Sequence, residues 1–417
     1  SLGSASVSPD GKQIAFTSRG DVFVTATDYT TTRQITQGSE ANRGVTFGAD
    51  NKSVVYASSQ DGTWDLYLAK LGRSEDPNFP NAHAIKEEKL IPSLKGEKMY
   101  PLFSPDGSEV AFLLDRERLM VYNLRTRQTR QITDGSQSLS DYVWSPDGKW
   151  IAVCYLARNR APYTDIGIVT AEGGKAIHNL TNSGYFSSNP RWSSDGSILL
   201  YETDKYGMRN HASWGSMTDL MAIFLNREAY EKYRMNDEDL ALLEEAEKQA
   251  KADTTKTKKA QPAKSTNGVI EWDNLDLRTV RITPASSRLG DYILSSDNKK
   301  LFYFSATEAG EDLWVYDMRK HTTQLQKKMN LSSPFFASDK KGTKLFILGA
   351  SPMTLDPKTD ATKAITMAGH RRIDRIRERE VMYEEVVREE EARFYRKDMH
   401  GVNWKKLTDH YRTFLPY

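Results

Sequence analysis

The sequence has a single cysteine, no long hydrophobic run and almost no net charge. The lone Cys154 excludes an internal disulfide framework and a multi-cysteine metal site, and its apolar neighbours in WIAVCYLA predict a buried thiol. No stretch approaches the roughly 18 consecutive apolar residues of a membrane-spanning helix. Lys and Arg total 58 against 56 Asp and Glu, so the net charge of +2 favours neither nucleic acid nor an anionic membrane as a partner.

Common catalytic motifs are missing as well. The sequence has no Gly-x-Ser-x-Gly elbow, no His-Glu-x-x-His zinc helix, no Gly-x-x-x-x-Gly-Lys phosphate loop and no Gly-x-Gly-x-x-Gly. The seven histidines are scattered along the chain. We therefore assign no catalytic residue, no metal ligand and no cofactor to these residues.

What the sequence does contain is a repeat with seven copies. Segments such as TRQIT, which occurs at 32–36 and again at 129–133, close most of the units. The clearest copies of the opening segment are VSPDGKQIAF (7–16), FSPDGSEVAF (103–112), WSPDGKWIAV (144–153) and WSSDGSILLY (192–201). The aspartates of the seven copies are Asp10, Asp50, Asp106, Asp147, Asp195, Asp297 and Asp339.

Each unit is predicted to be a four-stranded meander. In Ser-Pro-Asp-Gly, proline presets φ, aspartate can bond its own backbone and glycine takes a positive φ, which together make a tight turn between two strands. Two further strands complete a unit of roughly 40 residues, the size of a β-propeller blade. Seven copies in register disfavour the alternative, an ordinary β-sandwich with coincidentally similar turns.

We therefore predict an all-β fold in which residues 1–367 form a seven-bladed β-propeller of four-stranded blades. The first unit begins with its own inner strand at 3–8, and the seventh ends with its own outer strand at 362–366. No strand is then left to cross between the first and last blades. The prediction is an open ring without strand exchange.

The fifth unit carries an insertion, because Asp195 and Asp297 lie more than twice the usual spacing apart. We predict a helical and disordered insertion in this blade over about 207–268. Helix-forming residues predict a helix at 227–252, with an apolar stripe at Leu240, Leu243 and Ala246. The polar, Lys- and Thr-rich segment 253–268 predicts a mobile linker.

The last 50 residues, 368–417, are predicted to form a separate helical segment. Apolar residues at helical spacing predict a helix over 371–398, Gly401 breaks it, and Asn403 is placed to cap a second helix. We expect the apolar side chains of this segment to pack against protein. The four for which this is predicted are Tyr383, Val387, Phe394 and Trp404.

Here the sequence resembles a known family. The tail REREVMYEEVVREEEARFYRKDMHGVNWKKLTDHYRTFLP (377–416) is similar to the opening of the first core domain of tricorn-type serine peptidases. The start SVSPDGKQIAFTSRGDVFVT (6–25) resembles their second propeller, and YGMRNHASWGSMTDLMAIFLNREAYEKY (206–233) resembles their bacterial members. The resemblance covers essentially the whole chain.

The resemblance implies that residues 368–417 begin a peptidase core domain whose remainder is absent. In that family the catalytic histidine lies downstream of the Met-His-Gly-Val-Trp turn, and the serine nucleophile lies beyond a PDZ-like domain. Both would fall past Tyr417. We therefore expect this chain alone to be inactive and its parent protein to be a serine peptidase.

A propeller has an axial channel lined by the starts of its innermost strands. Counting three residues back from the aromatic or apolar residue before each turn gives seven equivalent positions, small and polar, with two carboxylates and no cation. Such a ring suits the passage of an extended peptide or weak attraction for its positive end. The predicted channel residues are Ser4, Gly44, Tyr100, Asp141, Asn189, Asp291 and Ser333. In the insertion, Arg209 and His211 are further candidates for contact with a ligand.

The predicted function is thus that of a non-catalytic propeller, guiding or filtering peptides to an active site outside this chain. A TolB-like protein-binding scaffold is one alternative, and the propeller of a prolyl-oligopeptidase-type enzyme is another. The resemblance implies peptides and the remaining core and PDZ-like domains as partners, with a homo-oligomer as a further option and no nucleic acid. It also implies a cytoplasmic protein. A periplasmic one stays open because the sequence begins without an initiator Met.

Overall fold

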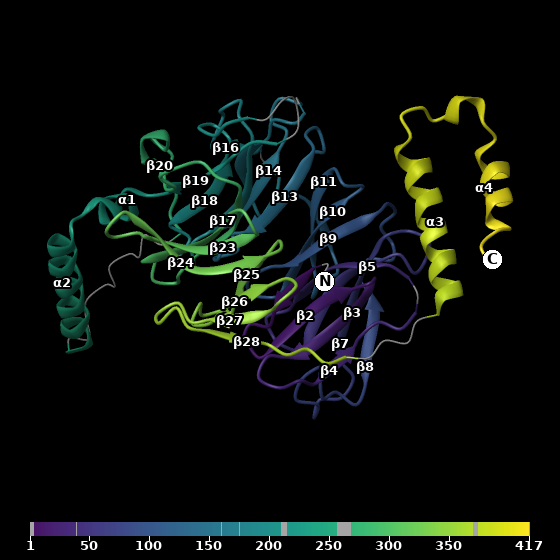
Figure 1. Ribbon diagram of the computed structural model, residues 1–417, viewed down its shortest axis with the longest axis horizontal. Helices are drawn as coiled ribbons and strands as arrows, with labels where there is room; N and C mark the ends of the chain where they lie inside the picture. Colours follow the sequence, from purple (N-terminus) through teal and green to yellow (C-terminus); the bar gives the residue numbers. More distant parts are fainter. Residues whose placement is uncertain are drawn as a thin grey trace.

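The computed structural model describes residues 4–38, 40–159, 161–174, 176–209, 215–256, 268–369 and 374–416. It confirms the seven-bladed propeller (Figure 1). Each blade is an antiparallel sheet of four strands that follow one another in the sequence. Because each repeat supplies a whole sheet, the repeat boundaries read from the sequence coincide with the blade boundaries.

The strands follow in chain order through the seven blades. Blades 1 and 2 contain β1 (Ala5–Val7), β2 (Gln13–Ser18), β3 (Asp21–Ala26), β4 (Thr32–Gln34), β5 (Asn42–Phe47), β6 (Ser53–Ser58), β7 (Asp65–Leu71) and β8 (Ile85–Lys89). Blades 3 and 4 contain β9 (Lys98–Phe103), β10 (Glu109–Leu114), β11 (Arg118–Asn123), β12 (Thr129–Gln131), β13 (Leu139–Trp144), β14 (Trp150–Tyr155), β15 (Asp165–Thr170) and β16 (His178–Asn179).

The last three blades are built in the same way. Blade 5 contains β17 (Ser187–Trp192), β18 (Ile198–Thr203), β19 (Asp219–Phe224) and β20 (Thr279–Arg281), with the short helix η1 (Asp276–Arg278) before β20. Blades 6 and 7 contain β21 (Leu289–Leu294), β22 (Lys300–Ala306), β23 (Glu311–Asp317), β24 (Thr322–Leu331), β25 (Phe335–Ser338), β26 (Leu345–Leu348), β27 (Met353–Leu355) and β28 (Thr362–Ala364).

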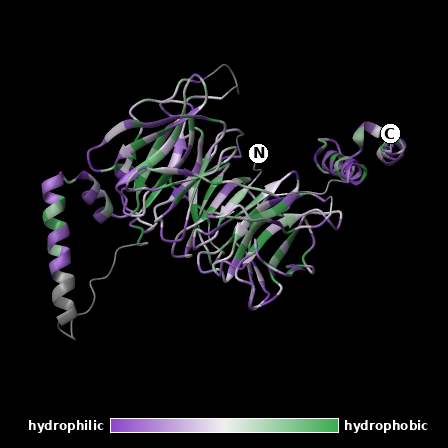
Figure 2. Ribbon diagram, turned by 60° about the horizontal axis from the view of Figure 1, so that its bottom comes forward, coloured by the Kyte–Doolittle hydropathy of each residue, from purple (hydrophilic) through white to green (hydrophobic). Residues whose placement is uncertain are grey.

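The hydrophobic core lies between neighbouring blades. Leu66 and Leu68 of blade 2, for example, pack in one cluster with Val110 and Phe112 of blade 3. Figure 2 shows the hydrophobic strands inside the blades. Cys154 lies in this core with 1% of its surface exposed, as its apolar neighbours predict, and burial raises the pKa of its thiol.

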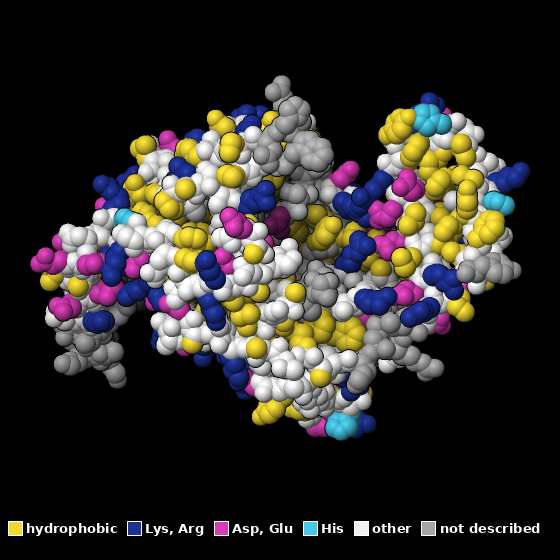
Figure 3. All heavy atoms as spheres, viewed as in Figure 1, with side chains coloured by type: hydrophobic (Ala, Val, Ile, Leu, Met, Phe, Trp, Pro, Cys, Tyr) yellow, Lys and Arg dark blue, Asp and Glu magenta, His cyan; other side chains and the backbone are white. Residues whose placement is uncertain are grey.

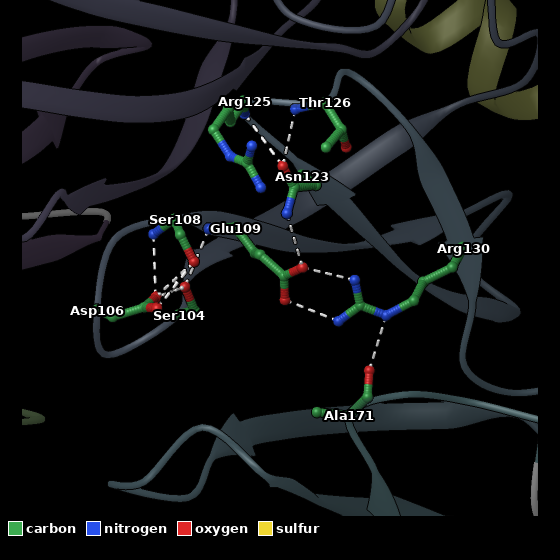
Figure 4. Close-up of polar contacts among 9 residues, drawn as sticks. All are labelled: Ser104, Asp106, Ser108, Glu109, Asn123, Arg125, Thr126, Arg130 and Ala171. Carbon is green, nitrogen blue, oxygen red and sulfur yellow. Dashed lines mark hydrogen bonds and ion pairs between the residues drawn. The ribbon is translucent and has the colours of Figure 1, made fainter.

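The Ser-Pro-Asp-Gly turns are held by their own side chains (Figure 4). In blade 3, Ser104 Oγ donates to Asp106 Oδ1 at 2.6 Å, and the Ser108 amide donates to the same oxygen at 3.0 Å. The Glu109 amide in turn donates to Ser104 Oγ, and Gly107 has a φ of 74°. Side chains therefore satisfy backbone groups that the turn leaves without a strand partner. The same bonds recur at Asp10, Asp147, Asp195 and Asp297.

Asp106→Ala is expected to lower the free energy of unfolding by about 1–2 kcal/mol, because three donor groups of the turn lose a charged acceptor. The Ser104 hydroxyl and the Ser108 amide hold the pKa of Asp106 below its ordinary value of 3.8. The stabilisation is therefore present above about pH 4 and is lost as pH falls through the lowered pKa of the folded state. Urea unfolding at several pH values checks this, with the exposed Glu172→Ala as control. A difference in the free energy of unfolding between wild type and Asp106→Ala that stays constant down to acidic pH would contradict this prediction.

The TRQIT segments of the outer strands tie blades to one another. Arg130 forms a two-point ion pair with Glu109 of its own blade, at 2.6 and 2.7 Å (Figure 4). Its Nε donates to the Ala171 carbonyl of blade 4 at 2.9 Å. In blade 1, Arg33 likewise donates to the Ala82 carbonyl of blade 2. The arginine of this segment is thus an inter-blade contact.

An aspartate at the start of the third strand forms a second recurring contact. In blade 4, Asp165 accepts a hydrogen bond from Thr181 at 2.7 Å, and blades 1 and 5 have equivalent bonds from threonines that follow the outer strand. Blade 2 has no threonine at this place. There Asp65 pairs with two lysines, Lys89 at 2.7 Å and Lys98 at 2.5 Å.

The ring closes without strand exchange among the described residues, as predicted. Blade 1 holds β1 to β4 and blade 7 holds β25 to β28. At the seam, Phe16 of blade 1 packs with Phe346 and Leu348 of blade 7, and one isolated parallel bridge joins Thr31 to Ala368. The Lys340 amide of blade 7 also donates to the Pro9 carbonyl of blade 1 at 2.9 Å. Side-chain packing, supplemented by these backbone contacts, therefore holds the ring shut.

The insertion of blade 5 differs from its predicted form in two ways. The strand β19 lies within 207–268 and divides the insertion, because its six residues are all buried in the blade. The predicted helix is broken at Met235, whose backbone is extended, so that α1 (Arg227–Arg234) and α2 (Asp237–Lys256) are separate helices. α2 reaches Lys256, so residues 253–256 of the predicted linker are helical, and 257–267 lie outside the described residues. Of the predicted stripe, Leu240 and Leu243 are half-buried beside a cavity of about 250 Å³ next to α1, and Ala246 is exposed.

The tail contains α3 (Arg375–Arg393), the short helix η2 (Met399–Gly401) and α4 (Trp404–Arg412). Asn403 caps α4 by accepting from the Lys406 amide at 3.0 Å, as predicted. α3 ends before Phe394, so the first helix is shorter than 371–398; residues 370–373 lie outside the described residues. The two helices pair through Tyr383, whose hydroxyl donates to the Thr408 carbonyl at 2.5 Å.

The four apolar side chains that were expected to pack against protein are only half-buried: Tyr383, Val387, Phe394 and Trp404. Other large apolar side chains of the tail are exposed, among them Val386 at 59% and Phe414 at 57%. Figure 3 shows hydrophobic side chains gathered on the face of this helical hairpin. The hairpin thus leaves a hydrophobic surface that the propeller does not cover.

The propeller has two faces that carry different loops and helices. The face that carries the Ser-Pro-Asp-Gly turns is called the turn face here, and the face where the inner strands begin is called the mouth face. α2 lies at the turn face, where Lys299 of a blade-6 turn is 3.6 Å from Glu244. α3 lies at the mouth face, where its partners Arg19, Gly62 and Arg116 belong to loops between second and third strands. The two helices therefore stand at opposite ends of the molecule (Figure 1).

Candidate channel mouth

The seven predicted channel residues all lie where inner strands begin, at the mouth face. Their exposure is uneven. Tyr100, Asp141 and Ser333 are exposed, whereas Ser4, Gly44 and Asn189 are half-buried. Asp291 is the most enclosed, with 9% of its surface exposed. The seven positions are thus equivalent in their place along the inner strands, but their side chains differ in exposure.

A β-bulge recurs at these positions. The register with the second strand shifts next to the predicted residue in five blades, 2 to 6. Gly44, Tyr100, Asn189 and Ser333 have positive φ values of 66°, 56°, 54° and 46°. A residue with positive φ is typical of a bulge that bends a strand and redirects a side chain. Glycine and asparagine at two of these positions are the only sign of it in the sequence.

Two tyrosines of the inner strands connect neighbouring bulges. The Tyr142 hydroxyl donates to the Tyr100 carbonyl, and the Tyr292 hydroxyl donates to the Asn189 carbonyl at 2.5 Å. In both cases the tyrosine follows a predicted channel residue and reaches the channel residue of the preceding blade. The mouth is therefore braced by hydrogen bonds between blades 3 and 4 and between blades 5 and 6.

Asp291 joins three blades. Its Oδ1 lies 2.9 Å from Arg191 Nη2 of blade 5 and accepts a longer bond, 3.4 Å, from Asn189. Its Oδ2 accepts from the Phe336 amide of blade 7 at 2.7 Å. Arg191 is a cation beside the ring, and the counting that gave seven positions without a cation did not find it. Its place in the strand, two residues after Asn189, gave no reason to expect it at the channel.

Two more carboxylates that the counting missed lie near this group. Glu202 of β18 accepts from Ser188 Oγ at 2.6 Å, and Glu311 begins β23. Removal from water raises the pKa of Asp141, and it raises the pKa of Glu202 and Glu311 in the same way. The wall formed by blades 4 to 6 is thus acidic, with Arg191 as a partial counter-charge.

Of the two insertion candidates, only Arg209 is among the described residues. It lies at the mouth face between β18 and β19, with Nη2 3.2 Å from Asp204 Oδ1. His211 lies outside the described residues. Within the described ranges, no three histidine, cysteine or acidic side chains are grouped as a metal site would require, and no helix is long and apolar enough to span a membrane.

The tail helix α3 borders the mouth face over blades 1 to 3 through polar contacts. Arg43 is 2.6 Å from Glu385, and Arg116 is 2.7 Å from Glu389. Arg388 donates to the Gly62 carbonyl at 2.7 Å. No described residue of α3 is fully buried. The helix is therefore held beside the mouth by charge and hydrogen bonds.

Comparison with solved structures shows the same fold in two peptidases. The crystal structure of the tricorn protease matches with a TM-score of 0.71 at 15% identity, covering 99% of this chain and 39% of that chain. A puromycin-hydrolyzing peptidase of Mycobacterium tuberculosis matches with a TM-score of 0.58 at 15% identity, covering 90% of this chain and 54% of that one. At such identities the likeness shows a shared propeller fold.

Sequence comparison finds partial relatives. A family model described as the Tricorn protease C1 domain matches residues 376–417. The Tol-Pal system protein TolB of Francisella tularensis is 26% identical over 208 residues, which is 46% of this chain and 43% of TolB. The uncharacterized peptidase YuxL of Bacillus subtilis is 29% identical over 109 residues, 24% of this chain and 16% of YuxL. The chain thus spans less than half the length of these curated relatives. In its propeller fold and in the sequence of its C-terminal segment it is similar to the tricorn proteases, which confirms the resemblance stated from the sequence.

Proposed function

We propose that this chain is the propeller portion of a tricorn-like serine peptidase and guides peptides toward an active site elsewhere in the same polypeptide. The observation that carries the proposal is that the polar channel mouth and the segment matching the C1 domain lie on the same face of the propeller. A peptide at the mouth would therefore be next to the start of the peptidase core. In this proposal residues 368–417 begin that core, the remaining core domains are partners, and the compartment is the cytoplasm.

The chemistry of the mouth supports an extended peptide as the ligand. Ser4, Asn189 and Ser333 offer small polar side chains. An extended peptide would make few apolar contacts with them as it passes. The acidic wall, which includes Asp141 and Asp291, attracts the ammonium end of a peptide. The Asp141 residue is exposed, yet the surrounding protein partly desolvates its carboxylate and raises its pKa, so this attraction should weaken as pH falls through that raised value and the carboxyl becomes neutral.

A photo-cross-linking amino acid at Ser4 tests the proposal. Short peptides with a free amino end are expected to cross-link at Ser4 and to be recovered uncut. The control places the same photo-cross-linking amino acid at the exposed Asp28, in the β3–β4 turn away from the mouth, and should capture far less peptide. Equal capture at the two positions would contradict passage through the channel. Hydrolysis that a serine-directed inhibitor abolishes would contradict the non-catalytic role.

A TolB-like scaffold is the second candidate, because 46% of the chain aligns with TolB at 26% identity. Such a scaffold would bind a folded protein rather than an extended peptide. Protection of the mouth residues from chemical labelling by a folded partner, without protection by short peptides, would favour this function over peptide guidance.

A further inference from the structure

Three loops of blades 4 and 5 enclose a cavity of about 470 Å³ at the mouth face, separate from the predicted channel residues. The loops are β14–β15, β16–β17 and β18–β19. Each contributes an arginine, a tyrosine or both to the cavity wall. The lining residues are Arg158, Tyr163, Asp165, Ser183, Gly184, Tyr185 and Arg209.

Arg209 is held in a defined position at this cavity. Its guanidinium lies over the ring of Tyr185 at 5.2 Å and over that of Tyr163 at 5.7 Å. Asp204, whose side chain is 7% exposed, fixes it from one side at 3.2 Å. The Arg209 side chain remains 41% exposed, so part of the guanidinium is available to a ligand.

The second arginine has a neutral partner. Arg158 Nη2 donates to Asn182 Oδ1 at 2.7 Å. The buried Asp165 at the cavity wall already accepts bonds from Asn179, Thr181 and the Ser183 amide. The hydrogen bonds of Asp165 therefore stabilise blade 4 and its following loop. The cavity presents two guanidinium groups, and one of them, that of Arg209, has a carboxylate partner.

We propose that this cavity binds the carboxylate of a peptide, with Arg158 and Arg209 as its donors and the two tyrosine rings packing against the adjoining part of the chain. The planar guanidinium matches a carboxylate with two parallel hydrogen bonds. The proposal rests on the proposed function, because it takes a peptide as the ligand. It also gives the bound peptide an orientation, because the cavity binds its carboxylate while the acidic channel wall attracts its amino end.

The test is isothermal titration of the chain at low salt with three forms of one short, otherwise neutral peptide. The forms carry a free carboxyl terminus, an amidated terminus, or an amidated terminus with one glutamate added. We expect binding of the first or the third form, which identifies the terminal or the side-chain carboxylate as the source. The second form, which has no carboxylate, should bind roughly tenfold to a hundredfold more weakly than the form that binds.

Variants locate the effect. Arg158→Gln and Arg209→Gln should each weaken the binding of the carboxylate-bearing form by roughly tenfold or more. Arg125→Gln, an exposed arginine at the turn face, is the matched control and should change nothing. Equal affinity for all three peptide forms, or equal affinity of the two variants and the control, overturns the proposal. If the cross-link at Ser4 still forms in that case, only this cavity proposal fails; if it also disappears, the proposed function fails too.

Discussion

Asp65→Ala is expected to destabilise the propeller by about 3–5 kcal/mol, because it leaves a buried lysine without its counter-charge. Lys98 and Asp65 are 2% and 4% exposed, and their charged atoms lie 2.5 Å apart. The pair bridges blades 2 and 3, since Asp65 begins β7 and Lys98 begins β9. The measurement is the shift of the urea-unfolding transition relative to the unchanged chain.

Two controls separate this effect from the loss of an ordinary ion pair. Glu88→Gln removes the partner of Lys70 in a pair whose side chains are both more than half exposed, and should cost less than about 1 kcal/mol. The double change Asp65→Leu with Lys98→Met removes both charges and should recover much of the lost stability, because a buried pair replaced by apolar groups is often neutral. A single change at Asp65 as mild as Glu88→Gln would show that Lys98 finds another partner or water.

In about 1 M NaCl the tail helices are expected to leave the mouth face, while the propeller stays folded. The contacts of α3 with the propeller are ion pairs such as Arg43–Glu385 and Arg116–Glu389, with one hydrogen bond to the Gly62 carbonyl. Figure 3 shows the basic and acidic side chains facing one another across this interface. Surface ion pairs contribute only about 0–1 kcal/mol each and are screened by salt. Arg43 and Glu385 are 53% and 19% exposed, Arg116 and Glu389 are 25% and 26% exposed, and no described residue of α3 is buried.

Spin labels at the exposed Asp28 and Lys397 would report the docking as a distance between propeller and tail. A single distance at low salt should broaden at high salt. Reversing Arg43 and Arg116 to glutamate should broaden it at low salt, and adding Glu385→Arg and Glu389→Arg should restore it. A variant that ends at Gly369 is the control for propeller folding. An unchanged distance in salt and in the reversed variant would mean that contacts other than these charges hold the helix.

The propeller could be predicted because its turns are local. In Ser-Pro-Asp-Gly the aspartate, its two serine neighbours and the glycine satisfy one another within a few residues, so the pattern appears directly in the sequence. The cap at Asn403 was predictable for the same reason. Contacts of this kind depend on spacing alone.

The acidic wall of the mouth could not be predicted in this way. Arg191 meets Asp291 across 100 residues of sequence, and Glu202 comes from a second strand that was not counted as lining the channel. The bulges add to the difficulty, because one extra residue in a strand reverses which side chains face the channel. The break between α1 and α2 was missed although Asn236 and Asp239 form a helix start signal, which the structure confirms because Asn236 accepts from the Asp239 amide at 2.8 Å. The helix-forming residues on both sides suggested one continuous helix, while the fold needs a change of direction there.

The way the ring is closed has a consequence for how such a gene can change. Every sheet consists of four consecutive strands, and the seam between the first and last blades is closed by side-chain packing and a few backbone contacts between loops and turns. A duplication or deletion that begins and ends between two blades would therefore add or remove one complete sheet. In a ring closed by an exchanged strand, the same event at the seam would separate a strand from its sheet. Blade number in this architecture can thus vary by whole units, and each new blade needs only compatible faces toward its two neighbours.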